Sequence, residues 1–133
     1  MKTPLVKIDK CSNVVWLVDL PFHHSTERDH EKNYWVPIIF YPNKVTAGYD
    51  ESYGLKKTYF VDDGIAKVSD DGKVLFKKSV MQIFIENDLG HLIFPGEDFS
   101  FDPIHINDIQ PVTVDGLYYK KGDVFLSLRS MSM

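Results

Sequence analysis

The sequence contains one cysteine, Cys11, and no long hydrophobic run. A lone cysteine excludes an internal disulfide and fits a reducing compartment. The stretch 34–43, which contains no charged residue, is too short to span a bilayer and is broken by two prolines. The N-terminal segment reaches Asp9 and Lys10 before any long apolar stretch, which differs from the layout of a secretory signal. We therefore expect a cytoplasmic protein with no membrane partner.

Several motifs that carry known chemistry are also missing from the sequence. There is no GxGxxG or GxxxxGK[ST] phosphate loop, no GxSxG elbow, no HExxH or CxxC pattern and no EF-hand spacing. We therefore expect no cofactor and no metal site. The net charge of −4 further disfavours non-specific binding to nucleic acid.

The residues that are present indicate one globular β-rich domain over 1–133. Apolar residues make up 44% and charged residues 26% of the chain, and the apolar ones form short runs rich in Val, Ile, Phe and Tyr. Turn residues separate these runs, and we expect hairpin turns at 62–64, 70–72, 115–116 and 121–122. The sequence predicts a mainly β fold, a single antiparallel domain built as a sandwich or half-open barrel with one or two short helices. A β-rich α+β fold is the alternative.

Three segments are candidate helices: Thr26–Lys32, Ala47–Tyr53 and Val80–Leu89. The last has Ser79 as a candidate N-cap and Gly90 as a stop, but its β-branched residues also fit a strand. For 80–89 both helix and strand therefore stay open.

Alternating or continuous apolar segments also predict the core. We expect ten residues to be mostly buried: Val15, Leu17, Ile39, Phe60, Leu75, Ile83, Ile93, Phe101, Ile106 and Phe125. The uncharged segment 34–41 contains Pro37, which cannot donate to a ladder, so we expect an unprotected edge strand there. That edge predicts a homodimer.

The most unusual feature is an acidic stretch, Val80–Gly116, which has seven acids and no Lys or Arg. If Phe99 and Phe101 face inward on a strand, Asp98 and Asp102 face outward together. Such a surface attracts a basic partner, although a solvated outer face would look the same. The candidate binding residues of this stretch are Glu86, Asp88, Glu97, Asp98 and Asp102.

Other chemistry-bearing residues fit structural explanations better. His23, His24 and His30, with Asp29, suggest zinc or iron ligands, but surface histidines in a polar loop are commoner. A further two histidines, His91 and His105, fit strand edges or turns, and Cys11 fits a small buried hydrophobe rather than a nucleophile. Two tyrosines in a polar loop, Tyr49 and Tyr53, complete the candidate binding residues.

Taken together, the sequence predicts a non-enzymatic binding protein whose acidic surface engages a basic protein, as an inhibitor or immunity-type protein would. One alternative is a small-molecule-binding domain with an aromatic pocket for a cationic or planar ligand. The other is a small enzyme that uses His and carboxylate groups from separate loops.

Overall fold

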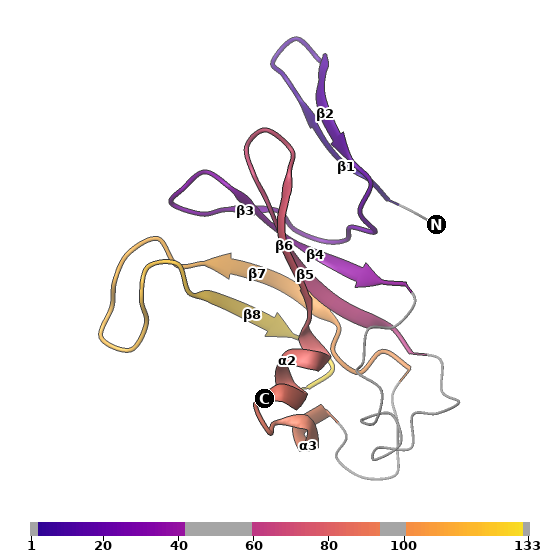
Figure 1. Ribbon diagram of the computed structural model, residues 1–133, viewed down its shortest axis with the longest axis vertical. Coiled ribbons are helices and arrows are strands. Elements are labelled where there is room, and N and C mark those ends of the chain that lie inside the picture. Colours follow the sequence, from indigo (N-terminus) through magenta and orange to yellow (C-terminus); the bar gives the residue numbers. More distant parts are fainter. Residues whose placement is uncertain (1–2, 42–59, 94–100, 132–133) are drawn as a thin grey trace.

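A computed structural model describes residues 3–41, 60–93 and 101–131, and this part of the chain forms three antiparallel sheets and two short helices (Figure 1). The predicted mainly β, antiparallel fold is confirmed, and within the described residues no sheet closes into a barrel. The first sheet has two strands, β1 (Leu5–Ile8) and β2 (Val14–Val18). The second has four strands in chain order, β3 (Glu27–Arg28), β4 (Tyr34–Phe40), β5 (Asp62–Val68) and β6 (Val74–Ser79). The third pairs β7 (Ile106–Pro111) with β8 (Val124–Leu128).

Three hairpin turns in the first two sheets share one design. Each spans five residues, 9–13, 29–33 and 69–73, and the first residue donates its backbone N–H to the carbonyl of the fifth. The side-chain oxygen of the first residue, Asp or Ser, accepts the N–H of the fifth. The fourth residue has a positive φ in every case: Ser12, Lys32 and Gly72. This design explains why the predicted helix at 26–32 is wrong, because the Asp29 side chain bonds to a turn rather than capping a helix.

The predicted turn at 62–64 is also wrong, because these residues begin β5. Asp62 pairs with Phe40, and Gly64 pairs with Ile38. A Cβ built on Gly64 would lie 2.3 Å from the Phe40 ring and 2.7 Å from the Lys78 carbonyl oxygen. The glycine therefore permits close packing rather than a turn. The turn at 70–72, by contrast, is confirmed between β5 and β6.

Near the C-terminus, one long connection replaces the expected series of hairpins. Residues 112–123 join β7 to β8, and the predicted turns at 115–116 and 121–122 both lie inside this connection. Lys121 donates its N–H to the Asp115 side chain, and Gly122 donates to the carbonyl of Val112. Residues 121–122 form a turn inside this connection, whereas the predicted turn at 115–116 is not formed, so this region is a single hairpin.

Strand β4 is not an unprotected edge. On the side away from β5, Ile39 donates its N–H to the Pro21 carbonyl, and His23 donates to the Pro37 carbonyl. Phe22 forms a bridge with Ile38 between these two bonds. The edge that predicted a homodimer is therefore covered by the chain's own residues, and self-association stays a prediction without that support. The covering segment also brings His23 close to β5.

The segment 80–89, for which helix and strand were both left open, contains helix α2 (Val80–Glu86). Ser79 caps it by accepting the N–H of Gln82, and the same hydroxyl donates to Asp62 over 2.6 Å. A second helix, α3 (Gly90–Ile93), follows. The predicted helix at 47–53 lies outside the described residues. None of the helices described is long and apolar enough to cross a membrane.

The core consists of two clusters, and the predicted core is only partly right. Phe60, Ile93 and Ile106 are buried, and Ile39 and Ile83 are half-buried. The other five are exposed: Val15, Leu17, Leu75, Phe101 and Phe125. In β2 the continuous apolar run offers no polar residue to indicate its outer face, and Val18 rather than Leu17 points inward. Cys11, expected to be buried, is exposed in the first hairpin turn.

Candidate functional site

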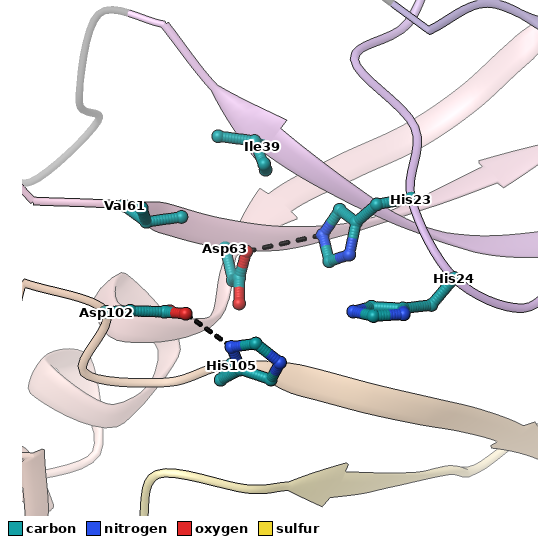
Figure 2. Close-up of a pocket in the computed structure, with 7 residues that line it drawn as sticks. All are labelled: His23, His24, Ile39, Val61, Asp63, Asp102 and His105. Atoms are coloured by element: carbon teal, nitrogen blue, oxygen red, sulfur yellow. Dashed lines mark hydrogen bonds and ion pairs between the residues drawn. The ribbon is translucent and has the colours of Figure 1, made fainter.

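A pocket of about 230 Å³ lies where the segment before β3 meets β4, β5 and the segment leading into β7 (Figure 2). Three imidazoles and two carboxylates gather there beside two aliphatic side chains. The lining residues are His23, His24, Ile39, Val61, Asp63, Asp102 and His105.

Hydrogen bonds of the backbone bring these distant parts of the chain together. The bond from His23 N–H to the Pro37 carbonyl fixes the first histidine segment beside β4. Ile39 of β4 and Asp63 of β5 are cross-strand partners, which places them at the same level of the sheet. On the other side, Arg129 donates its N–H to the His105 carbonyl, which ties the end of β8 to the start of β7. The pocket thus joins the second and third sheets.

Two of the pocket histidines have a left-handed backbone conformation. His24 has φ 56° and His105 has φ 49°, values in a region that residues other than glycine adopt at an energetic cost. Backbone strain of this kind is concentrated at functional sites, where the surrounding structure holds the residue in place. This conformation directs both imidazoles toward the same pocket (Figure 2).

The His105 ring is oriented by Asp102, three residues before it in the chain. The Asp102 carboxylate binds the Nδ1 atom of His105. Because an ionised carboxylate only accepts hydrogen bonds, Nδ1 carries the proton, which leaves Nε2 available to a ligand. The ring lies 5.7 Å from that of His24, measured between ring centroids.

A second histidine–carboxylate pair lies across the pocket. The Nε2 atom of His23 is 3.3 Å from Oδ1 of Asp63, although the geometry is too poorly aligned for a hydrogen bond. The other oxygen of Asp63 accepts the backbone N–H of Ile106 at 2.9 Å. The His23 ring meets the His24 ring edge-on, with 4.8 Å between centroids.

His24 therefore lies between two other imidazoles. His24 is exposed, yet its pKa is held below its ordinary value by partial desolvation of the ring, and then by the charges of His23, His105 and Arg129. The negative charge of Asp63 opposes this shift without reversing it. His24 is thus a neutral imidazole at pH 7, ready to accept a proton from a bound hydroxyl.

Three of the predicted acidic binding residues, Glu86, Asp88 and Asp102, lie in the described part of the chain. Asp102 was expected to face outward, but its side chain points into the pocket, while Phe101 is 57% exposed. Asp102 does not lie on a strand, because residues 101–104 form a run of bends in which Pro103 follows Asp102 directly. Glu86 lies on α2 and pairs with Lys78, and the exposed Asp88 follows that helix.

Four further candidates, Glu97, Asp98, Tyr49 and Tyr53, lie outside the described residues. Binding roles for the candidate residues stay predictions. The suggested histidine metal site is not formed, because His30 is in the hairpin turn 29–33 and does not line the pocket. Within the described residues, no three His, Cys, Asp or Glu side chains are placed to hold a metal ion.

Sequence reasoning missed the grouping of His23, His24, Asp63 and His105, which lie up to 82 residues apart. Asp63 was assigned to a turn, and His105 was considered without a partner. The Asp-Pro-Ile-His order of 102–105 was the one local signal, because a proline after the acid favours a bend that returns the histidine to it.

Comparison with known proteins corrects the functional prediction. A family model described as arylsulfotransferase (ASST) matches residues 4–133, whereas no curated protein and no solved structure matches the chain. Arylsulfotransferases are enzymes that transfer sulfate groups, so the prediction of a non-enzymatic binding protein is wrong. The alternative of a small enzyme using His and carboxylate groups agrees with the match. Because the match covers nearly the whole sequence, the chain belongs to the arylsulfotransferase family.

Proposed function

We propose that this chain transfers a sulfuryl group from an aryl sulfate to a phenolic acceptor, and that the reaction takes place in the histidine pocket. Family membership supports the reaction class. The observation that carries the assignment to this pocket is the convergence of three imidazoles on it, two of them in a left-handed backbone conformation.

The net reaction needs one proton acceptor and no redox partner. The acceptor oxygen forms a bond to sulfur as the bond between sulfur and the donor oxygen breaks, and the departing phenolate keeps that electron pair. The acceptor hydroxyl loses its proton to His24, and His24 returns the proton to the departing phenolate. One aryl sulfate and one phenol thus give another aryl sulfate and another phenol, with all atoms and charges balanced.

The other lining groups suit the remaining requirements of the reaction. The His105 ring, held by Asp102, lies beside His24 and helps to position it. Arg129, whose backbone N–H binds the His105 carbonyl, adds a positive charge that lowers the pKa of His24, and the same charge favours an anionic donor. Ile39 and Val61 supply an apolar wall for an aromatic ring.

The proposal is tested by incubating the full chain with 4-nitrophenyl sulfate and a phenol of different mass. We expect release of coloured 4-nitrophenolate that depends on the phenol, together with the sulfated phenol detected by mass spectrometry. Colour release without sulfated phenol would indicate hydrolysis rather than transfer. Absence of both products, with the chain folded, would refute the proposed function.

The pH dependence of the same assay provides a further prediction. Because the pKa of His24 lies below about 6.5, the base is unprotonated at pH 7, and kcat/KM falls only as the pH drops through that lowered pKa. Measured with one substrate pair from pH 4.5 to 8, the profile should be flat near neutrality and decline on the acidic side. An acidic decline centred above pH 7 would contradict the assignment of His24 as the base.

A further inference from the structure

Asp63 is the most enclosed carboxylate of the pocket and contacts both sides of it. The residue is 2% exposed and belongs to β5, in the middle of the histidine group. One of its oxygens binds the backbone N–H of Ile106, the residue that follows His105. The other faces Nε2 of His23 at 3.3 Å. A single buried side chain therefore joins the two segments that carry the pocket histidines.

We propose that Asp63 is a positioning residue that holds His23 and His105 on either side of His24 and thereby tunes the charge state of His24. Its consequence for catalysis rests on the proposed sulfuryl transfer, whereas its geometric and electrostatic effects do not. Asp63 is not assigned a contact with the reacting atoms.

The electrostatic part follows from the groups around His24. Those facing it are His23 from its own segment, Asp63 from β5, His105 with its partner Asp102 from the segment before β7, and Arg129 after β8. Asp63 raises the pKa of His24, whereas His23, His105 and Arg129 lower it. Removal of the Asp63 charge should therefore lower the pKa of His24 further, and removal of His23 should raise it.

The neighbouring residue in the strand offers a matched control. Asp62 is also fully buried, but it faces the opposite side of β5, where it accepts a hydrogen bond from Ser79 at the start of α2. Asp62→Asn removes the same charge one residue away from the pocket side. A loss of folding stability caused by removing a buried charge would appear in both variants. A shift of the His24 titration midpoint should appear only in Asp63→Asn.

The test is an NMR titration of the imidazole Cε1–H resonances in the full chain without substrate. The His24 resonance is assigned by its loss in His24→Gln. We expect the His24 midpoint to move to lower pH in Asp63→Asn and to higher pH in His23→Gln, and to stay in place in Asp62→Asn. An unmoved midpoint in folded Asp63→Asn would overturn the proposal. If Asp63→Asn does not fold, His23→Gln decides, and an unmoved midpoint there overturns the proposal.

Activity then separates this inference from the proposed function. With the parent active, Asp63→Asn should lower kcat by about 10- to 100-fold through displaced imidazoles, and the acidic limb of its pH profile should move to lower pH. If Asp63→Asn keeps the parental kcat and the acidic limb of its pH profile does not move, the positioning role of Asp63 is overturned. If the midpoints shift as expected while the parent transfers no sulfuryl group, the proposed function fails but the effect of Asp63 on His24 stands.

Discussion

Replacement of His24 by glutamine is expected to lower kcat for sulfuryl transfer by a factor of about 10² to 10⁴, the range that a positioned proton acceptor contributes. Glutamine keeps a polar side chain of similar reach but cannot accept the proton of the acceptor hydroxyl. The pocket between His23 and His105 should otherwise be retained, so KM should change far less than kcat. Initial rates with 4-nitrophenyl sulfate and saturating phenol measure both quantities.

The matched control is His30→Gln, because His30 is exposed in the hairpin turn 29–33 and does not line the pocket. This variant should keep the parental kcat. Equal losses in His24→Gln and His30→Gln would point to a general effect of losing a histidine. An unchanged kcat in His24→Gln would remove the proton-accepting role from this residue.

Ile106→Ala is expected to lower the free energy of unfolding by about 2–5 kcal/mol, the cost of truncating a well-packed aliphatic side chain to alanine. Ile106 is 0% exposed, and it packs in the core cluster that contains Ile104, Ile109 and Met81. Its backbone N–H is the group bound by Asp63, so the cavity should also loosen the pocket. Chemical denaturation followed by circular dichroism measures the change.

Ile8→Ala is the corresponding control, since Ile8 is 60% exposed on β1. The same deletion there should change stability by no more than about 0.5 kcal/mol. A comparable loss in both variants would show that burial of Ile106 does not determine the effect.

The fold class was predictable because it depends on local chemistry. Short β-branched and aromatic runs separated by turn residues indicate antiparallel strands, and Ser79 before an apolar segment indicates the start of α2. The Asp62–Gly64 turn was predicted wrongly because the same residues also suit a crowded strand. Only the tertiary contact with Phe40 explains why glycine is required there.

The histidine pocket depends on contacts that a single sequence does not display. His24 and His105 are 81 residues apart, and their rings meet only after the segment carrying His24 covers the edge of β4. Asp63 lies between them in sequence, but its role depends on a bond to the backbone of Ile106. The acidic stretch was chosen as a candidate site because charge can be read directly from a sequence. The left-handed backbone conformations of His24 and His105 cannot.

An aryl sulfate should bind among the pocket histidines, and an NMR titration with 4-nitrophenyl sulfate measures this binding. The chain has five histidines: His23, His24 and His105 line the pocket, while His30 and His91 do not. Binding in this pocket predicts that the imidazole resonances of the three pocket histidines shift together and saturate, while those of His30 and His91 stay in place. Saturable binding that leaves the three pocket resonances unmoved, or moves only those of His30 and His91, would contradict it.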